Sequence, residues 1–374
     1  MINTNPIPLF NLNKQHESLR EEINSAAIRA LDSMRWIIGP ETENFELEFA
    51  KALDAKHCIA CSSGASAIQI ALGACGIGKG DHVITTPFTF IATTSSISLT
   101  GAEFSFADVD SVTGNLSPEG IEKRITKNTK AILPVHIYGY PAEMDRIMKI
   151  AQKHNLKVIE DCAQSHLAAY KGRMTGTIGH AGAFSFYPSK NLGACGDGGA
   201  VVTNDAEVAA NSRSLRHCGR KADKTYEYGF EGSTLRMDDV QAAILRVKLK
   251  HLAEWTELRR KAAAKYDDAL KGLPVVVPSD PGAGSSQSYY VYTIKAPRRD
   301  ELAAFLSSRK IGNAIYYPMP LYKQPVYQHL GFDPKDYPNT EKLTTEVLSL
   351  PMFPEISDSD IARVAAAIKE FYGK

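Results

Sequence analysis

Short apolar runs alternate with longer amphipathic segments between about residue 40 and residue 216. Runs of this kind are typical of strands that are buried on both faces of a parallel sheet. The predicted strands are His57–Cys61, His82–Thr86, Glu103–Phe106, Ala131–Pro134, Lys157–Glu160, Ala183–Phe186 and Ala200–Thr203. Predicted helices between them include Glu41–Leu53, Ala65–Gly73 and Ala142–His154. The alternation indicates an α/β domain with a mainly parallel sheet.

The pattern changes after this region. A long helix is predicted over Asp238–Leu270, and the Pro/Gly/Ser-rich stretch Pro278–Ser288 follows it. The remainder predicts a strand, a helix and a terminal helix, at Tyr289–Lys295, Arg299–Arg309 and Ser357–Tyr372. We therefore expect a large α/β domain over residues 1–245 and a small α+β domain over residues 246–374. An N-terminal arm, residues 1–25, is expected to pack on the small domain.

Composition narrows the class of protein. The chain has 374 residues, 44% of them hydrophobic, which is enough for a buried core and argues against disorder. Its 43 Lys and Arg nearly balance its 42 Asp and Glu, so no global field favours nucleic acid or an anionic membrane. No apolar run approaches the ~18 residues of a membrane span. The first residues lack the apolar core of a secretory signal, so we expect a cytoplasmic protein.

Two motifs suggest chemistry that their context does not favour. Cys58 and Cys61 spell C-x-x-C, but on a strand residues three apart face opposite ways, which favours structural cysteines over a metal site. The stretch from Gly73 to Gly80 resembles a phosphate-binding P-loop, yet it lacks the final Ser or Thr and runs from helix to strand. A helix end and a turn fit it better.

Polar residues follow three of the predicted strands. Ser63 and Gly64 open a helix whose free N–H groups suit a phosphate, although an ordinary capped helix has the same pattern. Asp161 ends an apolar strand, where ligands of doubly wound sheets bind, although a solvated acid would also fit. Lys190 follows a strand and precedes a glycine-rich loop. Most lysines are surface groups, but a desolvated lysine there can form a Schiff base with a carbonyl.

These motifs together resemble one family. The segments Ser62-Ser63-Gly64, Ile159-Glu160-Asp161-Cys162-Ala163-Gln164 and Phe184-Ser185-Phe186-Tyr187-Pro188-Ser189-Lys190-Asn191-Leu192-Gly193 are similar to those of the DegT/DnrJ/EryC1/StrS aminotransferases. The likeness extends from Pro8 to the terminal helix. It implies the aspartate-aminotransferase-type fold (PLP fold type I), the cofactor pyridoxal 5′-phosphate, and a homodimer with shared active sites. It also implies transfer of an amino group from L-glutamate to a keto sugar, usually nucleotide-linked, with ping-pong kinetics.

The resemblance also implies a role for individual residues. Lys190 would hold the cofactor and move the proton, Asp161 would pair with the pyridinium nitrogen, and Gln164 would bond near the ring hydroxyl. Phe88 would stack on the ring. The remaining cofactor contacts, most of them to the phosphate, are expected from Ser63, Gly64, Ala65, Ser185 and, across the dimer, Thr234. The substrates are expected to meet Arg236, Tyr316 and Tyr317. No metal is expected.

The chain departs from the family at three of these positions. Ala65 replaces a frequent Thr, Thr234 replaces an Asn, and Tyr316 replaces a His. The segments around His136 and after Tyr317 are more similar to members that aminate C3 of the sugar than C4, and His136 itself is either a packed histidine or a substrate contact. Two other hypotheses stay open. One is a cofactor-dependent enzyme of another class, such as a lyase or a sugar dehydratase, and Lys190 argues against the dehydratase branch. The other is an inactive regulatory relative.

Overall fold

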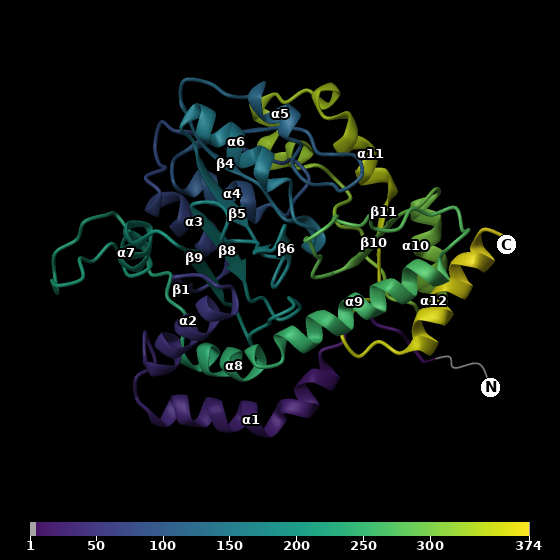
Figure 1. The fold of residues 1–374 in the computed structure, drawn as a ribbon, viewed down its shortest axis with the longest axis horizontal. Helices are drawn as coiled ribbons and strands as arrows, with labels where there is room; N and C mark the ends of the chain where they lie inside the picture. The colour runs from purple at the N-terminus through teal and green to yellow at the C-terminus, as the bar shows by residue number, and fades with distance from the viewer. Residues whose placement is uncertain (1–4, 374) are drawn as a thin grey trace.

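The computed structural model describes residues 5–373 and has a seven-stranded sheet at its centre (Figure 1). Its strands are β1 (His57–Cys61), β2 (His82–Thr85), β3 (Glu103–Phe106), β4 (Thr129–Leu133), β5 (Lys157–Asp161), β8 (Ala181–Ser185) and β9 (Gly199–Thr203). They lie in the order β1-β9-β8-β5-β4-β2-β3. Only β9 runs antiparallel to its neighbours in this sheet. The predicted strands and the predicted α/β class are confirmed.

Helices cover both faces of the sheet, because nearly every sheet strand is apolar on both sides. One face packs against α3 (Gly64–Ala74), α4 (Ala92–Leu99) and α7 (Ala206–Leu215). The other packs against α2 (Pro40–Ala52), α5 (Pro118–Glu122), α6 (Met144–His154) and α8 (Asp239–Leu249). Cys61 belongs to the first core and Cys58 to the second, so the two thiols lie on opposite faces of β1 as predicted.

A second hydrophobic core lies beside the central sheet and its covering helices, at the right of Figure 1. It joins β10 (Tyr292–Lys295) and β11 (Val347–Leu350) to α9 (Leu252–Ala269), α10 (Arg299–Ser308) and α12 (Asp358–Phe371). The single long helix predicted over Asp238–Leu270 is wrong. It is broken after Leu249 because α8 packs on the sheet while the later part of α9 packs on the second core.

The N-terminal segment touches both cores. Ile7 is buried in the second core and pairs with Ile311 through a parallel bridge. The helix α1 (Asn13–Asp32), which the sequence pattern did not predict, packs along α8 instead. The proposed division between residues 245 and 246 falls within α8.

The remaining elements are short. They are β6 (Ala169–Tyr170), β7 (Arg173–Met174), α11 (Pro338–Glu346) and the 3₁₀ turns η1 (Ile137–Gly139), η2 (Leu321–Lys323), η3 (Pro325–Leu330) and η4 (Pro334–Asp336). The stretch that resembles a P-loop is a helix end and a turn, as predicted, because α3 stops at Ala74 and β2 starts at His82. None of the described helices combines the length and apolar character needed to cross a membrane.

Candidate active site

A cavity of about 730 Å³ lies where β1, β5 and β8 end. These strands run in the same direction, so their carboxyl ends meet at one edge of the sheet. Most of the predicted site residues line this cavity, namely Ser63, Gly64, Ala65, Asp161, Gln164, Ser185, Lys190, Tyr316 and Tyr317. Segments that are far apart in the sequence therefore converge on one space.

The first turn of α3 forms one wall of the cavity. Ser63 caps the helix, since its Oγ accepts a hydrogen bond from the Ser66 N–H at 3.1 Å. Gly64 follows, and a Cβ added there would lie 2.6 Å from the Cβ of Ser185. Only glycine allows β8 to approach so closely. The N–H groups of the first helical turn and the Ser185 hydroxyl thus border the same part of the cavity, an arrangement that suits a phosphate.

Asp161 lies at the end of β5 and is 5% exposed. Its Oδ2 accepts a hydrogen bond from the Thr93 hydroxyl at 2.9 Å, and its Oδ1 accepts one from the Ala163 N–H at 3.1 Å. Burial raises the pKa of this carboxyl above its usual value, while the two hydrogen bonds oppose that change. A carboxylate held this way favours a cationic partner in the cavity.

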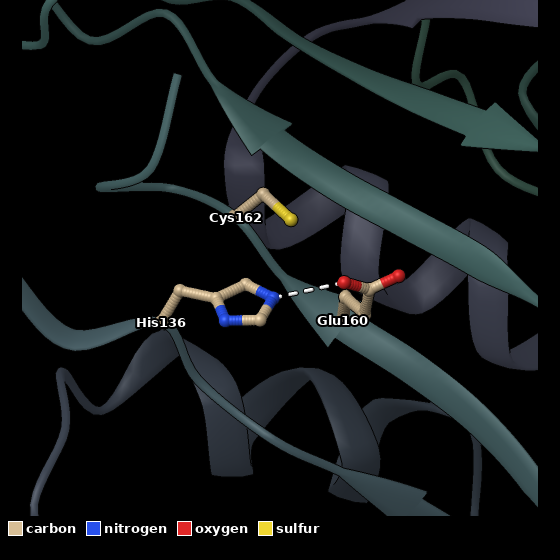
Figure 2. Close-up of side chains that lie close together, drawn as sticks. All are labelled: His136, Glu160 and Cys162. Atoms are coloured by element: carbon tan, nitrogen blue, oxygen red, sulfur yellow. Dashed lines mark hydrogen bonds and ion pairs between the residues drawn. The ribbon is translucent and has the colours of Figure 1, made fainter. Parts of the chain in front are cut away.

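Three buried side chains lie close together near the end of β5, as Figure 2 shows: His136, Glu160 and Cys162. Their ligand atoms lie within 4.8 Å of one another, as in metal sites. However, Glu160 already accepts hydrogen bonds from three backbone N–H groups and from His136 Nε2. His136 Nδ1 accepts the Ala142 N–H at 3.0 Å. The cluster is thus a hydrogen-bonded support, and His136 is a packed histidine with no access to the cavity.

Lys190 enters the cavity from the loop after β8. Loss of surrounding water lowers the pKa of its ammonium to about 8, although the nearby Asp161 carboxylate opposes this shift. Its Nζ lies 4.0 Å from the centroid of the Tyr290 ring. A lysine with this pKa has a substantial neutral, nucleophilic fraction near neutral pH.

Gln164 is fixed by two contacts. Its Oε1 accepts the Tyr138 N–H at 2.6 Å, and its Nε2 donates to the Tyr317 hydroxyl at 3.2 Å. Because the amide oxygen is taken by the backbone, the NH₂ end faces the cavity. Gln164 therefore offers a donor there, as suits a ring oxygen.

The stacking role predicted for Phe88 does not fit its position. Its side chain is 1% exposed and packs edge-on against Tyr138 and Tyr317, outside the cavity wall. Phe90, two residues later, lines the cavity and is 58% exposed. The sequence motif contained both aromatic residues. Residues two apart in an extended segment would face the same side, so the bend over residues 87–89 is what separates Phe88 from Phe90.

Thr234 and Arg236 lie outside the cavity of their own chain. The Thr234 hydroxyl lies 3.4 Å from Cys218 Sγ, and Arg236 Nη1 lies 3.1 Å from His217 Nδ1. Their predicted roles thus depend on a second chain. Sequence reasoning missed Thr93 and Tyr290, which touch Asp161 and Lys190 from distant segments and carry no local signal.

Comparison with known proteins matches the family model described as the DegT/DnrJ/EryC1/StrS aminotransferase family over residues 17–369. The chain belongs to this family. It is 46% identical to a pleiotropic regulatory protein of Geobacillus stearothermophilus, over 98% of both chains. It is 42% identical to UDP-N-acetyl-3-dehydro-alpha-D-glucosamine 3-aminotransferase of Acidithiobacillus ferrooxidans, over 99% of both.

A solved structure gives the same result. DesV of S. venezuelae, determined in complex with a ketimine intermediate, is 40% identical over 99% of both chains, with a TM-score of 0.95. The family resemblance inferred from the motifs is confirmed. The protein is accordingly a pyridoxal-phosphate-dependent transaminase with the fold of that family.

Proposed function

We propose that this transaminase carries an amino group from L-glutamate to C3 of a nucleotide-linked keto sugar. The observation that supports this most is the convergence of Lys190, Asp161 and the first turn of α3 on one cavity. Its volume lies in the upper part of the range for ligand sites. It therefore leaves room for a sugar beside a phosphorylated pyridine.

The residues present fit the cofactor. The close approach at Gly64 brings the α3 N-terminus and the Ser185 hydroxyl together as a phosphate site, which Ser63 and Ala65 complete. Asp161 would pair with the protonated ring nitrogen, Gln164 would donate to the ring oxygen, and Phe90, which lines the cavity, would cover the ring in place of Phe88. When bound, pyridoxal phosphate supplies an aldehyde for amines and a ring that accepts electrons.

Lys190 carries out the proton transfer. Its Nζ takes the proton from the α-carbon of L-glutamate and later gives a proton to the sugar carbon. A pKa of about 8 suits both directions near neutral pH, because neither the neutral nor the charged amine is rare. The same site must bind glutamate and sugar in turn, so ping-pong kinetics follow.

The sugar preference is supported by relatives. The Acidithiobacillus enzyme is named for amination at the 3-position of a UDP-linked sugar. Tyr316, Tyr317 and Met319 line the part of the cavity contributed by the segment after α10, and we assign them to the sugar. Aromatic and thioether surfaces suit the apolar faces of a deoxy sugar.

The test uses purified protein loaded with pyridoxal phosphate. L-Glutamate should change the cofactor absorption and release 2-oxoglutarate in wild type but not in Lys190→Ala. Panels of 3-keto and 4-keto sugars linked to UDP and dTDP should then restore the spectrum, the 3-keto sugars faster. The position of the new amine is read by NMR.

Each result decides between hypotheses. Restoration only by 4-keto sugars overturns the C3 assignment. Sugar deoxygenation without amino transfer favours a dehydratase. A protein that binds no cofactor favours the regulatory alternative, in line with the name of the Geobacillus relative.

We also propose that two copies form a homodimer with shared active sites. Large apolar side chains are exposed at Phe90 in the cavity wall and at Met34 and Trp36 just after α1. The loop after α7, which projects at the left of Figure 1, carries exposed Tyr226 and Tyr228 and leads back to Thr234. These surfaces suit burial against a second copy.

Mixing two inactive variants tests the shared site. Lys190→Ala and Arg236→Ala should each be inactive. After subunit exchange, about one quarter of wild-type activity should return, because half the dimers are mixed and each holds one intact site. If no activity returns after subunit exchange, each active site is formed by a single chain.

A further inference from the structure

The Tyr290 ring lies against the reactive end of Lys190. The Nζ is 4.0 Å from the ring centroid, and Tyr290 is 6% exposed and lines the cavity. A cation at this distance is attracted to the ring face. Among the described residues, no carboxylate forms an ion pair with Lys190. The Tyr290 ring face at 4.0 Å and the charge of the nearby Asp161 carboxylate both favour the charged amine.

The position of Tyr290 is fixed from several directions. Its N–H donates to the Tyr138 carbonyl at 3.1 Å, and its own carbonyl accepts from the buried Arg259 at 3.3 Å. Its ring stacks on Phe10 with centroids 5.5 Å apart. Its hydroxyl lies 3.3 Å from Ser189 Oγ, next to Lys190 in the chain. The ring is thus held before any ligand binds.

The residues just before Tyr290 join the loops that carry the site. Ser288 donates its N–H to the Gly139 carbonyl at 3.1 Å and its hydroxyl to the Gln164 carbonyl at 3.1 Å. The Asn191 side chain donates to the Ser288 carbonyl at 2.8 Å. Gly139 has a φ of +90°, and a Cβ there would lie 2.3 Å from the Ser288 hydroxyl. This segment therefore fixes the positions of the loops of Lys190, Gln164 and Tyr138 relative to one another.

We propose that Tyr290 is a positioning residue whose ring face holds the free ε-amino group of Lys190. The inference rests on the proposed role of Lys190. The amine is free while it moves the proton, and it must then stay within reach of the reacting carbon. A flexible lysine side chain has many conformations, and the ring restricts them to those that face the cavity.

Other titratable groups surround the amine, and a change in any of them could also alter the reactivity of Lys190. Asp161 raises its pKa, and His166 lies close enough to interact with its charge. Asp197, Tyr187, Tyr316 and Tyr317 also line the cavity. The test therefore changes only the ring, leaving all of these in place.

The first measurement needs neither cofactor nor substrate. Reductive methylation of Lys190 in the cofactor-free protein is followed by peptide mass spectrometry between pH 6 and pH 10. Tyr290→Leu should speed methylation at pH 7 threefold or more, because the ring no longer covers the amine or favours its charged form. Tyr290→Phe keeps the ring and should stay within twofold of wild type. Phe305→Leu removes a distant ring and should have no effect.

The second measurement is the glutamate half-reaction of the loaded enzyme. Tyr290→Leu should slow it tenfold or more with the glutamate dissociation constant within threefold, and Tyr290→Phe should restore the rate. If Tyr290→Leu does not fold, Tyr290→Met takes its place. Unchanged methylation and rate in the folded variant overturn the inference. If Tyr290→Leu speeds methylation but the wild-type protein aminates no sugar, the role of Tyr290 stands. Only the proposed sugar substrate is then refuted.

Discussion

Replacing Glu160 by Gln should destabilise the protein strongly, although the change removes no volume. Its Oε1 accepts the N–H groups of Ile178 at 2.8 Å and Gly179 at 2.6 Å. Its Oε2 accepts the Gly176 N–H and His136 Nε2, both at 2.9 Å. A glutamine has one carbonyl oxygen, so in either orientation its NH₂ group faces two donors.

The histidine cannot rescue the mutant by changing its tautomer. His136 Nδ1 accepts the Ala142 N–H, which assigns the ring proton to Nε2, the atom joined to Glu160 by the dashed line in Figure 2. Moving the proton to Nδ1 would break that other contact. Two buried donors are thus left unpaired, at about 1–3 kcal/mol each, or about 2–6 kcal/mol in total.

Urea unfolding measures this loss, and hydrogen exchange localises it. Glu160→Gln should lower the unfolding free energy by that amount and speed exchange at the amides of residues 176–179. Glu143→Gln is the matched control, since Glu143 is 52% exposed and pairs with Arg146 on the surface. It should change stability by less than about 0.5 kcal/mol. A loss below that value for Glu160→Gln, or unchanged exchange, refutes the reasoning.

Four other predictions concern the cavity. Gly64→Ala should weaken pyridoxal phosphate binding at least tenfold in a cofactor titration, because its Cβ meets Ser185. Asp161→Asn should slow the glutamate half-reaction by roughly a hundredfold in stopped-flow absorption, since a charge partner of the ring is lost. Phe90→Leu should weaken cofactor binding about threefold to tenfold in that titration, and Phe88→Leu should not. Methylation of Lys190 in the cofactor-free protein should rise with pH through about 8, because the neutral amine reacts and burial lowers its pKa.

Each of these has a contrary result. Normal cofactor affinity in Gly64→Ala would mean that the helix N-terminus does not hold the phosphate. A glutamate half-reaction in Asp161→Asn as fast as in wild type would show that the charge of Asp161 does not contribute to the rate. Equal effects at positions 88 and 90 would contradict the assignment of the cavity wall. A midpoint near the ordinary lysine value of ~10.4 would show that Lys190 is fully hydrated.

Strand positions were predictable because they depend on local pattern. Nearly every strand of the central sheet is a short apolar run next to a turn. The first and last residues of each strand differ by at most two positions between prediction and structure. The break between α8 and α9 was not predictable, since no Pro or Gly marks it. It arises from packing against two different cores, which are formed by residues far away in the sequence.

The same distinction applies to the site. Asp161, Lys190 and Gly64 were predicted because each stands near a strand end with a local signal, and all three line the cavity. Phe88 was misassigned because pattern gives the spacing of two aromatics but not which one faces the ligand. Tyr290 could not be found, because its contact with Lys190 spans 100 positions and depends on how the segment before β10 docks onto the Tyr138 loop.

The reversed strand β9 explains how the proposed phosphate site comes to border the same cavity as Asp161 and Lys190. It pairs antiparallel with both β1 and β8, which makes those two strands parallel and puts their carboxyl ends at one edge. Direct antiparallel pairing of β1 with β8 would move the start of α3 to the opposite edge. Because β9 lies between β1 and β8, these two strands are separated by two strand spacings, about 10 Å.

The chain after β1 therefore has to cross the end of β9 to bring Gly64 to Ser185. Gly199, the first residue of β9, lies directly under this crossing, and a Cβ there would be 2.2 Å from the Ser63 carbonyl oxygen. A side chain at 199 would lift the loop away from β8 and open the contact between Gly64 and Ser185. The two glycines thus act together, one beneath the crossing and one at its end, and the close approach of β1 and β8 on which the proposed phosphate site depends needs both.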